Sequence, residues 1–99
     1  MLLLDHLRNE LPPLCQQFGI GSVEVFGSVA RQEEKPESDI DLLIEFAKDS
    51  DIPYNDRYFG FQFALEDKYN RNVDILTAST LRNPYLISEI EPEKLRIYG

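Results

Sequence analysis

Two aspartates, separated by a single residue, stand at the start of an apolar run near the middle of the chain. Asp39 lies before the run and Asp41 within it, and residues 40–46 have the composition of a buried strand. Residues two apart in a strand point to the same side, so we expect two carboxylates side by side. Such a pair repels unless a cation lies between, and oxygen ligands suit Mg²⁺ or Mn²⁺. The structural alternative is that one acid caps a turn and the other faces solvent.

A third acid, Asp74, interrupts the apolar stretch of residues 73–76. Buried acids are uncommon unless they are paired or bound to metal. If this stretch is a strand beside that of Asp41, Asp74 completes a cluster of three carboxylates that can hold two divalent ions. One ion would steady a triphosphate, and the other would lower the proton affinity of an attacking hydroxyl. The alternative for Asp74 is an exposed side chain on an edge strand, and the sequence leaves both open.

A Gly27-Ser28 pair follows the alternating stretch 22–26, which predicts a strand, and precedes a short helix expected over 29–32. Glycine lets the backbone approach a ligand closely. The N-terminus of a helix offers free N–H groups and a positive dipole end, which favour phosphate. Because most Gly-Ser pairs are plain turns, this feature gains weight only from its neighbours.

The elements that must position these residues follow from hydrophobic periodicity. Leucines at helical spacing predict an N-terminal helix, which Pro12 and Pro13 divide into two short helices or kink. The strand at 40–46 is nearly continuous in apolar residues, so we expect it to be central and covered on both faces. The remaining expected elements are a helix from Asn55 or Asp56 to about Asn70, a strand at 73–76, a helix at 84–91 and an edge strand at 95–98.

One face of the long helix is predicted from Tyr58, Phe61, Leu65 and Tyr69. The added aromatics Phe59 and Phe63 cover more than one helix face. They indicate either a tightly packed core or an exposed patch for a partner.

These elements predict a small α/β (α+β) domain with a mixed β-sheet and flanking helices, and 99 residues leave room for one domain spanning 1–99. Acidic residues outnumber basic ones by 18 to 10, which gives a net charge of -8. That charge repels nucleic acid phosphates and anionic lipid, so we expect no direct nucleic acid binding and no membrane binding. Solubility alone is the other explanation of the charge. The single cysteine and the short apolar N-terminus lead us to expect a cytoplasmic protein.

The stretch Gly27-Ser28-Val29-Ala30-Arg31, ten intervening residues after the serine, and then Asp39-Ile40-Asp41-Leu42-Leu43 form one pattern. It resembles the signature of the DNA polymerase β-like nucleotidyltransferases, and most closely their small stand-alone branch, the minimal nucleotidyltransferases (MNT). The resemblance implies the polymerase β-like fold and nucleotidyl transfer from ATP.

The resemblance also implies a role for each residue of the pattern. Gly27 and Ser28 would bind the nucleotide phosphates; Asp39, Asp41 and Asp74 would be the catalytic carboxylates that bind two Mg²⁺ ions, with Mn²⁺ as a substitute. Arg31 would either touch phosphate or acceptor, or brace the loop by an ion pair with Glu33 or Glu34. Relatives usually have glycine after that arginine, and Gln32 stands there in this chain. This departure leaves the shape of the following loop open.

The family further implies a partner. Minimal nucleotidyltransferases are commonly paired with a HEPN-domain protein, an RNase toxin, in a prokaryotic toxin–antitoxin module. The resemblance implies that this chain is the antitoxin, forms a hetero-oligomer with the toxin, and transfers AMP from ATP to a toxin tyrosine. Two alternatives stay open: an antitoxin that acts by binding alone, and transfer to a small molecule.

Overall fold

A computed structural model describes residues 2–99 of the chain. Four strands alternate with four α-helices and one short 3-10 helix, η1. In chain order the elements are α1 (Leu3–Phe18), β1 (Ile20–Phe26), α2 (Gly27–Arg31), β2 (Ile40–Phe46), α3 (Tyr54–Tyr69), β3 (Val73–Thr77), η1 (Ala78–Thr80), α4 (Pro84–Ile90) and β4 (Leu95–Tyr98).

The four strands form one mixed sheet in the order β3-β2-β1-β4. β1 pairs antiparallel with both β2 and β4, while β2 and β3 are parallel. A parallel pair needs a crossover connection, and α3 supplies it between β2 and β3. The prediction of an α/β domain with a mixed sheet is confirmed, and β2 is an interior strand as expected. The expectation that both faces of β2 are covered was wrong, because Glu45 is exposed and Asp41 is only partly buried.

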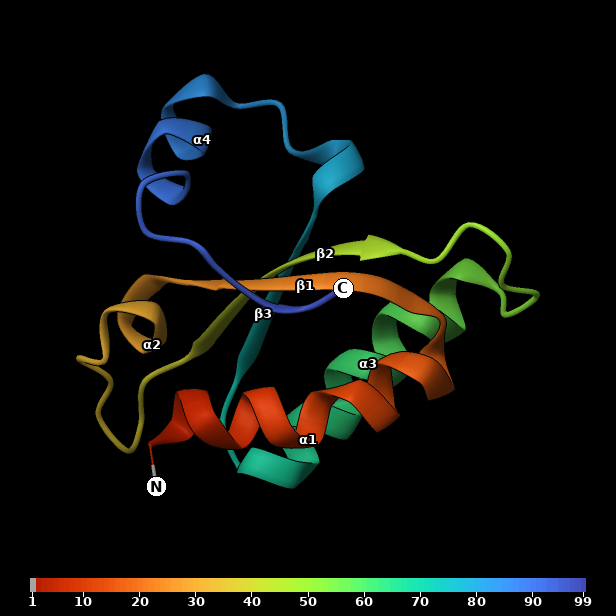
Figure 1. Ribbon diagram of the computed structural model, residues 1–99, viewed down its shortest axis with the longest axis horizontal. Coiled ribbons are helices and arrows are strands. Elements are labelled where there is room, and N and C mark those ends of the chain that lie inside the picture. The colour runs from red at the N-terminus through yellow and green to blue at the C-terminus, as the bar shows by residue number, and fades with distance from the viewer. Residues whose placement is uncertain (1) are drawn as a thin grey trace.

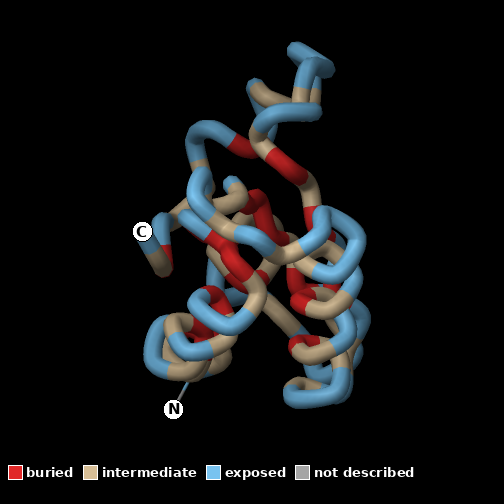
Figure 2. Tube along the Cα trace, turned by 90° about the vertical axis from the view of Figure 1, so that its right-hand side faces the viewer, coloured by how far each residue is buried: buried red, intermediate tan, exposed pale blue. Residues whose placement is uncertain are grey.

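One face of the sheet is covered by α1 and α3, which lie together below the strands in Figure 1. Buried residues gather where these helices meet the strands, as Figure 2 shows. Leu42 and Ile44 of β2 are fully buried against this side, together with Leu11, Phe61 and Leu65 of the helices. This apolar layer is the main core of the molecule.

The opposite face of the sheet is only partly covered. α4 and η1 lie on this side of the strands (Figure 1). Leu43 of β2 and Ile90 of α4 are buried outside the main core cluster, whereas Glu45, two residues after Leu43, is exposed. Because side chains alternate along a strand, Asp41 lies on this second face with Leu43 and Glu45. We call it the open face.

Three local predictions can be compared with the elements. Pro12 and Pro13 lie inside one continuous helix, α1, rather than between two. The carbonyls that lose their helical partners belong to Arg8 and Asn9, which are exposed, so water can satisfy them.

The predicted start of the long helix was wrong. α3 begins at Tyr54, and Pro53 occupies the N-cap in place of Asn55 or Asp56. The aromatics of α3 are divided between core and surface, since Phe61 is fully buried while Phe59 and Phe63 are 47% and 61% exposed. Within residues 2–99, no helix has the length and apolar character needed to cross a membrane.

Candidate active site

Three strands place the predicted site residues in one row. In the sheet register, Phe26 of β1 is opposite Asp41 of β2, and Asp41 is opposite Asp74 of β3. Neighbouring strands lie about 5 Å apart, so the two aspartates are adjacent and the turn after Phe26 starts beside them. The pairing of the strands of Asp41 and Asp74, which the sequence could only pose as a condition, is thus observed.

Asp41 is the least exposed acid of this row. Burial, repulsion from Asp74 and from Asp39, and a hydrogen bond with Asp74 raise the pKa of Asp41 to about 6, while Arg31 opposes the shift. An acid that holds its proton this tightly lacks a compensating positive charge. A divalent cation between the carboxylates would supply that charge, so the donor chemistry fits a hard metal ion.

The other two acids are more exposed than Asp41. Asp74 is exposed on the edge strand β3, as the alternative interpretation of the sequence held. It is nevertheless opposite Asp41 in the register of β2 and β3. Asp39 is exposed and lies just before β2 rather than within it. Over residues 2–99, no three acids, histidines or cysteines stand close enough together to ligate one ion. The structure therefore brings together the pair Asp41 and Asp74, with Asp39 near enough to act on Asp41 through its charge.

Gly27 forms the turn at the end of β1. Its φ is +73°, a conformation that side chains other than glycine rarely adopt. A Cβ at this position would collide with Oδ2 of Asp41. Glycine is therefore required both by the backbone and by the closeness of the carboxylate. The helix that follows, α2, has only five residues, so its dipole is small, and the backbone N–H of Gly27 is the stronger feature for binding an anion.

Arg31, at the end of α2, makes two ion pairs. Its Nε donates to Oε2 of Glu33 at 3.3 Å, which is the bracing contact proposed from the sequence. Its Nη1 donates to Oε2 of Glu93 at 2.9 Å. The other oxygen of Glu93 accepts the N–H of Gly27, also at 2.9 Å. Together, Gly27 and Arg31 hold a carboxylate between them.

Glu93 was missed by the sequence analysis. It lies 66 residues from Gly27 in the chain, and no local pattern marks it. The register between β1 and β4 explains its position, because Val25 is opposite Leu95 and a step of two residues on each strand puts Gly27 beside Glu93. The edge strand at 95–98 was predicted correctly, but the sequence did not indicate that it pairs with β1. Only that pairing would have revealed Glu93.

The departure at Gln32 has a direct structural meaning. Gln32 caps α2 with a φ of +59°, in the left-handed region, and its backbone N–H bonds the carbonyls of Ser28 and Val29. This is the conformation that glycine adopts most easily. The chain keeps the left-handed turn with glutamine, so the replacement strains the turn rather than reshaping it.

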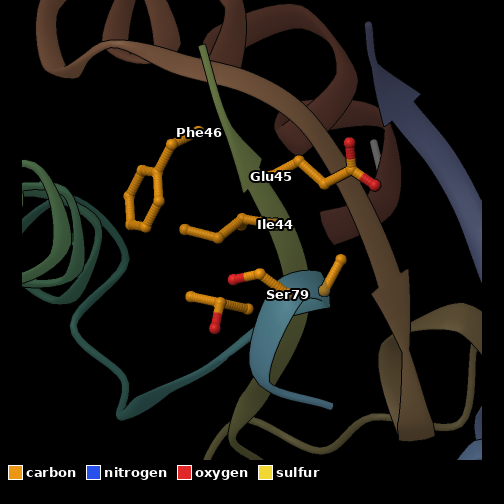
Figure 3. A pocket seen from close by; sticks show the side chains of 6 residues that line it. Ile44, Glu45, Phe46 and Ser79 are labelled. Atoms are coloured by element: carbon orange, nitrogen blue, oxygen red, sulfur yellow. The ribbon is translucent and has the colours of Figure 1, made fainter. Parts of the chain in front are cut away.

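The described pockets lie away from this row of residues. The one in Figure 3 has a volume of about 380 Å³ and lies between the end of β2 and η1, lined by Ile44, Glu45, Phe46, Thr77, Ala78 and Ser79. A second, of about 500 Å³, lies between β3 and the aromatic side chains of α3. Neither is lined by Gly27, Asp41 or Asp74. A surface site needs no deep cavity if a second molecule closes it.

Comparison with known proteins gives the same family as the residues. The model of the nucleotidyltransferase domain family matches residues 7–97. A relative from Methanocaldococcus jannaschii, provisionally named protein adenylyltransferase MJ0128, is 31% identical over 93 residues, which are 94% of this chain and 92% of the relative.

Solved structures agree in fold. One described provisionally as a minimal nucleotidyltransferase is 33% identical, has a TM-score of 0.72, and is matched over 96% of this chain and 95% of its own. A tri-AMPylated Shewanella oneidensis HEPN toxin in complex with an MNT antitoxin contains a chain with a TM-score of 0.66 and 16% identity, matched over 98% of this chain and 73% of that one. We conclude that the chain belongs to the nucleotidyltransferase domain family and is an enzyme of its minimal branch.

Proposed function

We propose that this chain is the antitoxin of a HEPN/MNT module and that it transfers AMP from ATP to a tyrosine of a HEPN RNase toxin. The observation that carries the proposal is the row formed by the Gly27 turn, Asp41 and Asp74 on three neighbouring strands. An anion-binding turn beside facing carboxylates suits a metal-bound nucleotide, since phosphoryl-type transfer requires mainly positioning and charge neutralisation.

In this proposal each residue of the row has one task. Gly27, through its N–H, Ser28, through its hydroxyl, and Arg31 bind the triphosphate. Asp41 and Asp74 would hold Mg²⁺, with Asp39 close enough to add its negative charge, and Mn²⁺ could replace it. Bound there, the metal would neutralise phosphate charge and favour the ionised form of the attacking hydroxyl.

The reaction is a substitution at the α-phosphorus of ATP. The tyrosine oxygen forms a new bond to that phosphorus, the bond from it to the bridging oxygen of the β-phosphate breaks, and pyrophosphate leaves. The tyrosine proton is released to solvent. The products are AMP-tyrosine and pyrophosphate, and no oxidant or reductant is needed.

A protein partner is favoured by the shape of the site. Asp39, Asp74 and Arg31 are all exposed, and neither of the pockets near β2 and β3 includes them. A tyrosine on a docking protein can reach such a surface, whereas a small acceptor would need walls to hold it. The net charge of -8 also suits a basic, RNA-cutting partner. This argument ranks transfer to a small molecule below transfer to a protein.

The test is transfer of label from ATP labelled at the α-phosphate to the product of the neighbouring gene, which this proposal expects to be a HEPN-domain protein, with Mg²⁺ present. We expect wild type to label a tyrosine and Asp41→Asn to lose at least a hundredfold in rate. Asp67→Asn, which removes an exposed acid of α3, is the matched control and should label at the wild-type rate. No labelling by wild type, or equal labelling by Asp41→Asn, would overturn the catalytic proposal.

A double variant separates catalysis from binding alone. Asp39→Asn combined with Asp41→Asn should still form the complex but should leave the RNase active on RNA. If that double variant inhibits the RNase as fully as wild type at equal complex formation, neutralisation comes from docking, and AMP transfer is not its cause.

A further inference from the structure

Two of the three groups proposed to bind phosphate already hold an anion of the protein itself. Gly27 N–H donates to Oε1 of Glu93 and Arg31 Nη1 donates to Oε2, both at 2.9 Å. The carboxylate thus uses one oxygen for each donor. Both bonds also lower the pKa of Glu93, so it is ionised at neutral pH.

Glu93 is held in place by its neighbours in the chain. The carbonyl of Ile90 accepts the N–H groups of Glu93 and Lys94, at 3.1 and 2.9 Å, in the turn after α4. Lys94 lies 3.5 Å from Glu24 of β1 and 3.1 Å from Glu91. The side chain of Glu93 is 27% exposed, compared with 66% for Glu33, the other partner of Arg31. The backbone hydrogen bonds of the turn therefore position Glu93 beside Gly27, in addition to its attraction to Arg31.

Carboxylate and phosphate oxygens compete for such donors because both are anionic acceptors. The backbone N–H of Gly27 is a single donor, and a good bond to Glu93 leaves none for a phosphate. Asp41, opposite Phe26 in the register, adds another negative charge beside the turn. A triphosphate that enters while Glu93 is in place would therefore meet an occupied donor and added repulsion.

We propose that Glu93 is an internal competitor of the nucleotide: it occupies Gly27 and Arg31 in the nucleotide-free protein, and the phosphates must displace it to bind. This inference rests on the proposed role of Gly27 and Arg31 as phosphate ligands. It makes Glu93 a determinant of nucleotide affinity, acting from the turn between α4 and β4. When displaced, Glu93 remains tied to Lys94 and β4, so it returns to Gly27 after product leaves.

The test measures the affinity of Mg-ATP for wild type and for Glu93→Gln by calorimetry, without the partner protein. Removing a charged competitor that makes two hydrogen bonds should tighten binding on the order of tenfold. Glu93→Asp keeps the charge but shortens the side chain. It should also tighten binding, because it weakens the contact of the carboxylate with Gly27 and Arg31. Glu89→Gln is the matched control, because it removes the same charge from an exposed position of α4, and it should change affinity less than twofold.

The amide resonance of Gly27 in a ¹H–¹⁵N spectrum separates the two proposals and also reports that each variant is folded. It should shift on replacing Glu93 and shift again on adding ATP. If ATP leaves this resonance unmoved in wild type, Gly27 is not a phosphate ligand and the proposed site fails. If ATP moves it in both proteins but Glu93→Gln binds no more tightly than wild type, or more weakly, Glu93 supports the turn and the competitor proposal alone is overturned.

Discussion

The two faces of the sheet differ in what they hold, although the same strands form both. On β2, Leu42 and Ile44 are fully buried under α1 and α3. Asp41, near the start of the same strand, lies on the opposite face together with Glu45. Alternation along the strand sends stabilising and reactive side chains to different layers. The carboxylates can repel one another on the open face because the apolar contacts of the covered face stabilise the fold.

Breaking the covered face should have the largest effect on stability. Leu42→Ala removes a fully buried side chain and leaves a cavity under α1 and α3, which should cost about 2–5 kcal/mol in the free energy of unfolding. Glu45→Ala, on the same strand but exposed on the open face, should change it by less than about 0.5 kcal/mol. Urea unfolding measures both. Equal losses in the two variants would show that the faces are not divided in this way.

Gly27→Ala should have the next largest effect, because it strains the turn between β1 and α2 beside Asp41. The new Cβ would have to take a φ of +73° and would press on the Asp41 carboxylate. We expect a loss of about 1–3 kcal/mol in stability. Nucleotide affinity should fall together with stability.

Ser28→Ala is the control for Gly27→Ala, since it removes the neighbouring hydroxyl without changing the backbone. It should leave the melting temperature within a degree or two and weaken Mg-ATP binding modestly. Unchanged stability in Gly27→Ala would mean that the turn is less constrained than its geometry requires.

Replacing Asp41 should raise the free energy of unfolding, in contrast to the replacements of Leu42 and Gly27. Its pKa rises from the ordinary 3.8 to about 6, so between these values the folded protein binds more protons than the unfolded chain. The free energy of unfolding therefore falls as pH rises through that range, and the loss is complete above pH 6. Asp41→Asn removes this loss, and in metal-free buffer at pH 7.5 it should be more stable by on the order of 1 kcal/mol.

The measurement is urea unfolding from pH 4.5 to 8 with a chelator present. Wild type should lose stability relative to Asp41→Asn as pH rises, whereas Asp67→Asn should follow wild type throughout. Because Asp41→Asn should also abolish label transfer, a gain in stability would accompany a loss of activity. A variant less stable than wild type at pH 7.5 would show that the carboxylate supports the fold instead.

Much of this division could be predicted from local sequence. The alternation of Asp41 with Leu42 and the helical spacing of Phe61 and Leu65 define the covered face, because burial follows periodicity. The pair Asp41–Asp74 required one further fact, that β3 pairs with β2. Glu93 could not be found, since its contact depends on which strand β4 joins. Long-range pairing is set by the whole sheet and leaves no mark in a short window.

The smallest expected effect concerns the turn after α2, where Gln32 adopts a φ of +59°. A left-handed residue with a side chain costs about 1–2 kcal/mol, while glycine costs about 0.4–1 kcal/mol in the unfolded chain. Gln32→Gly should therefore stabilise the protein by about 0.5 kcal/mol.

Gln32→Ala keeps the strain of the left-handed turn and should give no gain, so the pair isolates backbone conformation from loss of the glutamine side chain. The difference between them, measured by urea unfolding, tests whether the turn after α2 stores backbone strain. Equal stability of the two variants would show that Gln32 adopts its left-handed conformation without a measurable cost.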